Sequence, residues 1–330
     1  MTVLVTGGAG YIGSHMVHTL ADAGERVVVL DNLTTGFRSA IPQDVPLFVG
    51  ETGDASLVAS ILQAYDVRSI IHFAASIVVP ESVRDPLLYY RNNTANSRSL
   101  IEAAVKSGVE HFIFSSTAAV YGNPKIIPVH EEVATQPMSP YGTSKLMTEI
   151  MLHDVGVAHG LRHAILRYFN VAGADPRGRT GQSTPAATHL IKVAVQTALG
   201  SRAQLEVFGT DYPTPDGSCV RDYIHVTDLV SAHLAALTHL RGGGASVTAN
   251  CGYGRGYSVL DVIAAVKRVA NKDFPVKLSD RREGDPASIV ASAERIRELF
   301  NWTPAYADLD TIVAHALAWE QRLIASGSNT

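Results

Sequence analysis

The sequence predicts an α/β protein built on a doubly wound parallel sheet, followed by a smaller α/β unit. Short runs of β-branched residues alternate with longer helical segments through the first half of the chain, and several of these runs are apolar at nearly every position. Strands covered by helices on both faces have this character, and strand–helix alternation is typical of a parallel sheet. A glycine-rich turn between the first strand and the first helix is the third observation.

The elements of the first half follow from local patterns. β-branched and apolar runs predict strands at residues 2–6, 26–31, 46–50, 68–73, 111–115 and 163–168. The segments between these runs predict helices at residues 11–23, 55–63, 87–106 and 141–157.

The regular alternation stops after Asn170. The stretch VAGADPRGRTGQSTP is rich in Gly, Pro and Ser, which is a boundary signal. We therefore expect a dinucleotide-binding domain over residues 1–170 and a substrate domain over residues 171–330. A segment near residues 220–240 is expected to pack back on the first domain.

Composition argues against several classes of partner and site. The net charge is −4 and no long Lys/Arg run is present, which argues against a nucleic-acid partner. Cys219 and Cys251 lack paired spacing, so neither a disulfide framework nor a metal site is predicted. Without a signal-like start or an apolar run of about 20 residues, the expectation is a cytoplasmic protein with no membrane partner.

The first turn predicts a nucleotide site. Gly7, Gly10 and Gly13 permit a tight turn, a close approach of backbone to a pyrophosphate, and close helix–sheet packing. The helix N-terminus then offers free N–H groups to the phosphates. Asp31 ends the second strand, where a carboxylate binds the ribose of NAD and repels the extra phosphate of NADP, although Arg38 nearby keeps NADP open. The alternative is that Asp31 only begins a turn.

A catalytic group is predicted at the carboxyl edge of the sheet. Tyr141 and Lys145 are four residues apart on one helix face, and a Lys ammonium favours the phenolate form of Tyr, whose reference pKa is about 10. Ser115, Ser116 and Thr117 follow a strand and supply a hydroxyl that can share a substrate proton with Tyr141. An ordinary surface Tyr–Lys pair and a Ser/Thr turn are the alternatives.

These features together resemble the extended short-chain dehydrogenase/reductase superfamily. Within it, the resemblance is to the UDP-glucose 4-epimerase family and covers essentially the whole chain. The segments that carry it are GGAGYIG, DNLTTG, HFAA, FSSTAAVYG, SPYGTSK, LRYFNVAGA, VFGTDYPTPDGSCVRDYIHVTDL and RREGDPAS. The resemblance implies a Rossmann fold, tightly bound NAD and reversible 4-epimerisation of a UDP-hexose through a 4-keto sugar, serving UDP-galactose supply.

The resemblance also implies site residues. Tyr141 would be the base, Lys145 its partner, and Thr117 the catalytic hydroxyl. The implied NAD-binding residues are Gly7, Gly10, Tyr11, Ile12, Gly13, Asp31, Asn32, Glu51, Phe73, Asn92, Tyr141, Lys145 and Tyr168. The implied UDP-sugar-binding residues are Thr117, Asn170, Phe208, Arg221, Tyr223, Arg282 and Asp285. Arginine suits the diphosphate, because its planar fork donates charge-assisted hydrogen bonds.

Some positions depart from the family pattern. Glu51 stands where an Asp is usual, and Ile77 stands where some members have a Lys. Ser288 and Ile289 approach the 2-position of the sugar by family alignment, and a residue smaller than Tyr there leaves UDP-GlcNAc and UDP-GalNAc open as further substrates. The family is usually homodimeric through helices that correspond to residues 87–106 and 141–157.

Three rival functions differ in what they require. A sugar-nucleotide 4,6-dehydratase would have Asp-Glu after the catalytic Thr, whereas Ala118 and Ala119 follow Thr117 here. A net oxidoreductase would release NADH in stoichiometric amounts. A non-enzymatic NAD-sensing or scaffold protein could dispense with Tyr141 and Lys145, yet both are present.

Overall fold

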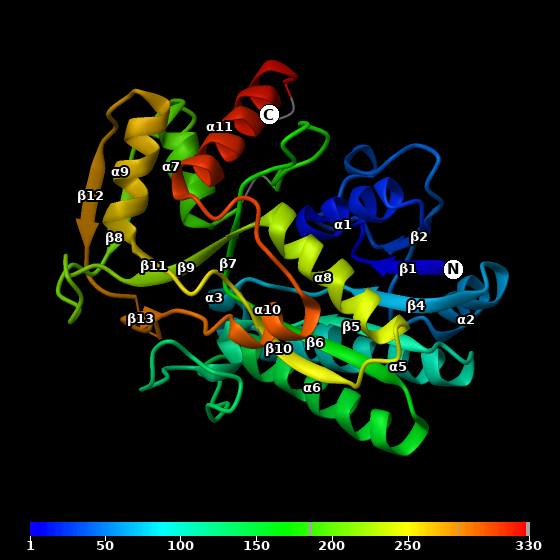
Figure 1. Ribbon diagram of the computed structural model, residues 1–330. Coiled ribbons are helices and arrows are strands. Elements are labelled where there is room, and N and C mark those ends of the chain that lie inside the picture. The colour runs from blue at the N-terminus through cyan, green and yellow to red at the C-terminus, as the bar shows by residue number, and fades with distance from the viewer. Residues whose placement is uncertain (185–186, 283, 328–330) are drawn as a thin grey trace.

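A parallel sheet forms the middle of the molecule (Figure 1). The computed structural model describes residues 1–184, 187–282 and 284–327, and within these the sheet has seven strands in the order β10-β6-β5-β4-β1-β2-β3. Every neighbouring pair in it runs parallel. The strands are β1 (Thr2–Thr6), β2 (Arg26–Asp31), β3 (Leu47–Val49), β4 (Val67–His72), β5 (His111–Ser115), β6 (Arg162–Tyr168) and β10 (Val247–Cys251).

Helices cover both faces of this sheet, which confirms the doubly wound fold. Alternate residues of β1 point to opposite faces, so Val3 and Val5 belong to one core cluster and Leu4 to the other. The first face is covered by α1 (Tyr11–Asp22) and α8 (Val226–Arg241). The second face is covered by α2 (Ala55–Ala64), α5 (Asn96–Lys106) and α6 (Pro140–His159).

The strand order reverses between β1 and β4. In open parallel sheets, ligands bind outside the carboxyl ends of the strands at such a switch point. The turn after β1 and the segment after β4 therefore flank the expected ligand crevice.

The predicted helix over residues 87–106 is confirmed as an unbroken helical run, but part of this run is π-helical. The chain forms α4 (Pro86–Tyr89), a π-helical segment η2 (Tyr90–Ala95) and then α5, and a short helix α3 (Val79–Arg84) precedes them. The side chain of Asn93 accepts from the Ser76 N–H at 2.8 Å and donates to the Ser76 carbonyl at 2.9 Å. A π-helical turn re-aims side chains and is frequent at functional sites.

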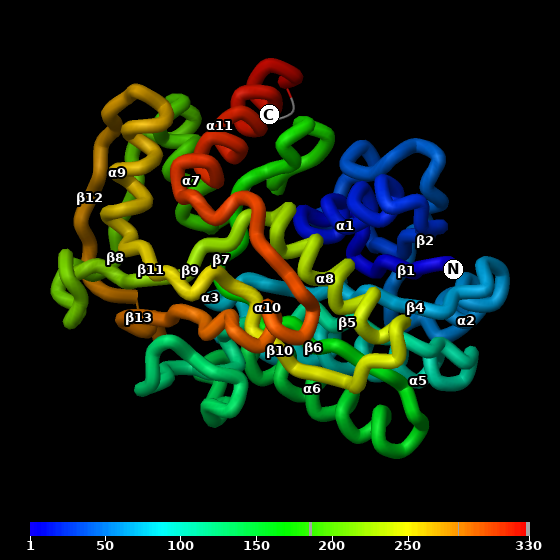
Figure 2. The backbone as a smooth tube through the Cα atoms, in the orientation of Figure 1, coloured from blue at the N-terminus to red at the C-terminus, as the bar shows by residue number. Residues whose placement is uncertain are grey.

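The second half of the chain builds two small sheets and returns to the first (Figures 1 and 2). In it, β9 (Val220–His225) pairs with β7, β11 and β13, and β8 pairs with β12. The other elements are η1 (Arg38–Ala40), η3 (Ala118–Tyr121), β7 (Asn170–Ala172), α7 (Leu190–Ala198), β8 (Leu205–Phe208), β11 (Gly256–Ser258), α9 (Val259–Ala270), β12 (Val276–Ser279), β13 (Ser288–Ile289), α10 (Glu294–Phe300) and α11 (Leu309–Ala325).

The chain crosses between the two halves more than once. Helix α8 packs on α1, β5 and β6, and β10 pairs with β6 in the main sheet. A boundary at residue 170 is thus not a clean division of the packing, because the sheet takes its last strand from the second half. The two-domain description, residues 1–170 and 171–330, stays a proposal about folding units.

The described residues offer neither a membrane-spanning helix nor a metal-binding cluster. None of the helices in these ranges is long and apolar enough to span a membrane. Likewise, no group of three or more His, Cys, Asp or Glu in the described chain is arranged to hold a metal ion.

Candidate active site

The turn after β1 forms a cradle that only glycine permits. Gly7 has a φ of +68°, and a Cβ there would lie 2.6 Å from the Ala74 nitrogen. A Cβ on Gly13 would lie 2.1 Å from the Gly7 carbonyl, whereas the nearest atom to a Cβ on Gly10 is that same carbonyl at 3.3 Å. Gly10 begins α1 without a side-chain cap, so the helix N-terminus is open to a phosphate group. This cradle fits a dinucleotide pyrophosphate.

The carboxyl ends of β2 and β3 bring three predicted residues together. Asp31 is buried, and its carboxylate accepts from the backbone N–H of Ala9 at 2.9 Å and of Leu33 at 2.8 Å. Asn32 donates to Glu51 at 3.0 Å, so the carboxylate that replaces the usual Asp lies beside Asn32. Asp31 therefore holds the glycine-rich turn in place in addition to any contact with a ribose.

Aromatic side chains gather over the first face of the sheet. Phe73 follows β4, and its ring centroid lies 4.9 Å from that of His233 on α8. Tyr168 ends β6, and its ring centroid lies 6.5 Å from the same imidazole. Ile12 packs on this core from α1. His233 is a neighbour that sequence reasoning missed, because its helix is far along the chain from both Phe73 and Tyr168.

Two other predicted cofactor residues have protein partners. Asn92 lies in the π-helical segment and donates to the Ser76 hydroxyl at 3.0 Å. The hydroxyl of Tyr11 donates to the Gly173 carbonyl at 2.7 Å. Tyr11 thus links the first turn of α1 to the segment that follows β7.

The structure brings Tyr141 and Thr117 together. Helix α6 begins with Pro140 after Ser139, whose hydroxyl accepts from the Gly142 N–H at 3.2 Å. Tyr141 therefore lies in the first turn of α6. Its buried hydroxyl is hydrogen-bonded to the Thr117 side chain, which in turn begins η3 after β5. The hydroxyl cluster and the Tyr thus form one polar group.

Lys145 is buried one turn further along α6. Its Nζ donates to the Ser115 carbonyl at 2.9 Å and lies 4.8 Å above the centre of the Phe114 ring. Burial lowers the pKa of Lys145 to about 7, against an opposing attraction from Glu149.

Lys145 was expected to lower the pKa of the Tyr141 hydroxyl, but in the protein without a cofactor it does not. Burial raises the pKa of the Tyr141 hydroxyl above its ordinary value, and the hydrogen bond with Thr117 offsets this only in part. The ammonium of Lys145 is bound to the Ser115 carbonyl and does not counter the desolvation of Tyr141. The protein by itself keeps Tyr141 in its protonated form.

Sequence reasoning missed Glu149. Its carboxylate forms an ion pair with Arg167 on β6 at 2.6 Å and accepts from the Ser116 hydroxyl. The signal was available, because Tyr141, Lys145 and Glu149 are spaced four residues apart and so share one helix face. A carboxylate on a face that points into a sheet needs a partner, and Arg167 is that partner.

Strand β9 places the second set of predicted residues. Arg221 and Tyr223 are two residues apart and so point to the same face of the strand. Tyr223 pairs in register with Asn170 of β7, and Arg221 with Ile289 of β13. Asn170 follows Tyr168 by two residues, so the two predicted sets meet where β6 passes into β7.

Two arginines and one carboxylate lie near Phe208. The guanidinium carbon of Arg282 is 4.8 Å from the centre of the Phe208 ring. Asp285 accepts from Arg282 at 3.0 Å and lies 3.8 Å from Arg221. Since two cations share one anion, the group carries excess positive charge, which suits a diphosphate beside an aromatic base.

Comparison with known proteins agrees with this geometry. Residues 3–252 match the NAD dependent epimerase/dehydratase family. A UDP-glucose 4-epimerase of Azospirillum brasilense is 58% identical over 321 residues, which cover 97% of this chain and 92% of the relative. The crystal structure of UDP-glucose 4-epimerase from Brucella ovis in complex with NAD has a TM-score of 0.93 at 44% identity and covers 96% and 97% of the two chains.

A further solved structure widens the comparison. The UDP-Glc/GlcNAc 4-epimerase of Campylobacter jejuni has a TM-score of 0.85 at 46% identity and covers 97% of this chain and 99% of its own. Because the family match spans most of the chain and the relatives align over nearly all of it, this chain belongs to the NAD dependent epimerase/dehydratase family.

Proposed function

We propose that this protein interconverts UDP-glucose and UDP-galactose by inverting C4 of the hexose through a 4-keto sugar, with tightly held NAD. The observation that carries the proposal is the buried hydroxyl of Tyr141, hydrogen-bonded to Thr117 at the carboxyl edge of the sheet. The uncapped N-terminus of α1 lies at the switch point of that sheet. The activity named for the relatives supports the same reaction.

The residues that would hold NAD fit it better than NADP. The pyrophosphate would lie on Gly7, Gly10 and Gly13, and the ribose near Asp31, whose carboxylate would repel a further phosphate. Arg38 donates to carbonyls of its own loop, at 3.0 and 2.8 Å, so its guanidinium is already used. When bound, NAD supplies the acceptor and the donor of the C4 hydride.

Tyr141, Thr117 and Lys145 would move and hold the proton of the C4 hydroxyl. Tyr141 takes this proton as the carbonyl forms and returns it when the sugar is reduced on its other face. Thr117 shares the proton through its hydrogen bond with Tyr141. Lys145 would be the partner of Tyr141 on the nicotinamide ribose, and the positive charge of bound NAD would favour the phenolate, which the buried Tyr141 does not reach on its own.

The UDP half of the substrate would be held firmly and the sugar loosely. Arg221 and Arg282 donate to the diphosphate, and the phosphates replace part of their contact with Asp285. Phe208 flanks the base, while Asn170 and Tyr223, which face each other across β7 and β9, line the route to the sugar. A fixed nucleotide lets the 4-keto sugar turn and present its other face.

Residues 288 and 289 favour UDP-GlcNAc and UDP-GalNAc as a second substrate pair. Ile289 pairs in register with Arg221, so Ile289 and Ser288 would lie beside the proposed diphosphate site. Neither side chain has the bulk of Tyr, so we expect the sugar site to admit an N-acetyl group. The Campylobacter jejuni relative is named for both Glc and GlcNAc. UDP-GalNAc should therefore be converted as well as UDP-galactose.

We also propose a cytoplasmic homodimer. Helix α6 exposes Met147, Ile150 and Val157, and Leu87 is exposed at the start of α4, so residues 87–106 and 141–157 offer an apolar surface to a second copy. Cys219 and Cys251 are free thiols, as is usual in a reducing compartment. Light scattering of wild-type protein and Ile150→Glu tests the assembly, because an added buried charge should shift the mass toward the monomer.

The first experiment supplies purified protein with UDP-galactose and no added NAD, and detects UDP-glucose with a coupled dehydrogenase. UDP-GalNAc is run in parallel. Conversion without added NAD supports both the reaction and the retained cofactor, whereas conversion only after NAD is added supports an exchangeable cofactor. No conversion of either sugar with NAD present would overturn the proposal, and stoichiometric NADH release would favour a net oxidoreductase.

A further inference from the structure

The loop of residues 173–181 lies along helix α1. It follows β7 directly, and its Gly173 carbonyl accepts from the Tyr11 hydroxyl at 2.7 Å. Further along the loop, the hydroxyls of Thr180 and Ser14 are hydrogen-bonded at 2.8 Å in a buried position. The first two turns of α1, which hold the open N-terminus, are thus bound to this loop.

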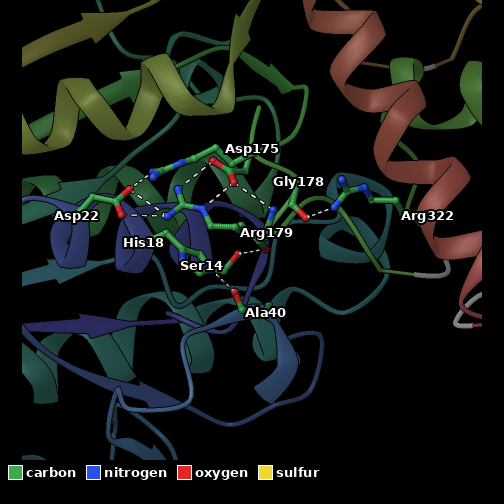
Figure 3. A network of polar contacts seen from close by, with 10 residues as sticks. Ser14, His18, Asp22, Ala40, Asp175, Gly178, Arg179 and Arg322 are labelled. Atoms are coloured by element: carbon green, nitrogen blue, oxygen red, sulfur yellow. Dashed lines mark hydrogen bonds and ion pairs between the residues drawn. The ribbon is translucent and has the colours of Figure 1, made fainter.

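The other end of α1 is held by Arg179 (Figure 3). Its guanidinium contacts both oxygens of Asp22, the last residue of α1, at 3.1 and 3.0 Å. The same guanidinium donates to Asp175 within the loop at 2.7 and 3.0 Å. Burial opposes the ionisation of Asp175, yet the hydrogen bonds from Arg179 hold the pKa of that carboxyl below its usual value.

The loop is closed on itself and on the C-terminal helix. The Asp175 N–H donates to the Thr180 carbonyl at 3.0 Å, and the Gly178 N–H donates to the Asp175 carbonyl at 2.7 Å. Gly178 has a φ of +69°, and its carbonyl accepts from Arg322 of α11 at 2.6 Å. This positive φ favours glycine at the turn, since L side chains rarely adopt it. Figure 3 shows these contacts running from Asp22 to Arg322.

We propose that the loop of residues 173–181 is a brace for the cofactor helix, and that Arg179 is a positioning residue for cofactor retention. The inference rests on the proposed function, since it takes NAD to lie in the cradle before α1. Arg179, Asp175 and Asp22 belong to neither proposed binding set. They act through α1, because backbone N–H groups bind a phosphate well only within narrow limits of distance and angle.

The brace also joins the two binding sets. It directly follows β7, which carries Asn170 of the proposed substrate site, and it is hydrogen-bonded to α1, which carries the proposed phosphate site. Loss of Arg179 removes its charge-assisted bonds to α1 while the glycine cradle itself is unchanged. Bonds of this kind correspond to about a tenfold change in an equilibrium or a release rate.

The test measures NAD release directly. Wild-type, Arg179→Ala and Arg177→Ala proteins are loaded with NAD, freed of excess nucleotide by gel filtration, and sampled over time for protein-bound NAD. Arg177 is the matched control, because it also pairs with Asp22 but its side chain is 62% exposed. Arg179→Ala should release NAD about tenfold faster than wild type, recover wild-type kcat in excess NAD, and keep its Tm in excess NAD. Arg177→Ala should release NAD at the wild-type rate.

Each other outcome has a defined meaning. If Arg179→Ala releases NAD at the wild-type rate, the proposed brace is wrong while the proposed function stands. The same holds if its kcat is lower and excess NAD does not restore it. If Arg179→Ala is insoluble, Arg179→Lys replaces it, since it keeps the charge but loses the planar fork. That variant should release NAD a few-fold faster, and unchanged release would overturn the brace. Wild-type protein that binds no NAD at all would overturn the proposed function as well.

Discussion

Glu149 and Arg167 form a buried ion pair whose closest atoms are 2.6 Å apart, one helical turn beyond Lys145. The two side chains are 2% and 8% exposed, respectively. Glu149 also accepts from the hydroxyl of Ser116, and Arg167 donates to the Tyr121 hydroxyl at 3.0 Å. The pair therefore links α6, which carries the proposed base, to β6 and to the residue that follows β5.

We predict that Glu149→Gln destabilises the fold. Removing one partner of a buried pair leaves an uncompensated charge on Arg167, which costs about 3–5 kcal/mol. The free energy of unfolding, measured with urea, should fall by this amount. Glu102→Gln is the control, because Glu102 pairs with Arg98 and Lys106 on the exposed surface of α5 and should matter little. Equal effects in both variants would show that the buried pair has no special role.

Tyr141→Phe should abolish most of the activity and leave the fold intact. The substitution keeps the buried ring, which packs edge-on against Tyr89 at 6.4 Å, and removes only the hydroxyl. Loss of a general base lowers the rate about 10²–10⁴-fold. The initial rate of UDP-galactose conversion is compared with the bound NAD content, which should be unchanged. Retention of a substantial fraction of wild-type rate would mean that another group takes the proton.

Arg282→Ala should weaken substrate binding without slowing turnover. Its guanidinium covers Phe208 and pairs with Asp285, so truncation exposes the base-stacking face and removes a diphosphate donor. KM for UDP-galactose should rise about tenfold or more while kcat stays within a few-fold of wild type. The adjacent Arg281 contacts Tyr212 and Asp211 instead, so Arg281→Ala serves as the control. A fall in kcat alone would argue against a binding role.

The buried His72 should lower the free energy of unfolding in acid. Its ring nitrogens are bonded to the hydroxyls of Thr6 at 2.6 Å and Ser97 at 2.8 Å, and burial, with a smaller effect of the Lys145 charge, lowers its pKa to about 3. The unfolded chain therefore binds more protons at this residue between about pH 6.5 and pH 3. As the pH falls through this range, the free energy of unfolding must fall with it.

The variant His72→Gln isolates this effect. From about pH 6 to about pH 5, wild type should lose up to about 1 kcal/mol more than the variant, because only wild type takes up the proton on unfolding. Urea unfolding at each pH measures the difference, and His130→Gln, which removes an exposed imidazole, is the control. Parallel pH profiles for wild type and His72→Gln would contradict the assignment.

Prediction from sequence worked where the pattern is local. Strands 2–6, 26–31 and 111–115 are confirmed with the same limits, and the other three expected strands are confirmed with ends that differ by at most one residue. The conformation required of Gly7 is also confirmed, since its φ is +68°. The helix over residues 87–106 is also confirmed, but its π-helical segment was not predicted, because the helical pattern does not show the contact of Asn93 with Ser76.

The sequence by itself determined the parallel sheet, the glycine cradle, and the spacing of Tyr141 and Lys145, because each depends on residues that are neighbours in the chain. Only the tertiary structure decided that Glu149 pairs with Arg167, that β10 returns to the first sheet, and that Arg179 joins α1 to the loop after β7. These contacts join segments that are 18 to 157 residues apart. Their partners are chosen by which surfaces the closed sheet brings together and by the cost of leaving a charge buried without a counterion.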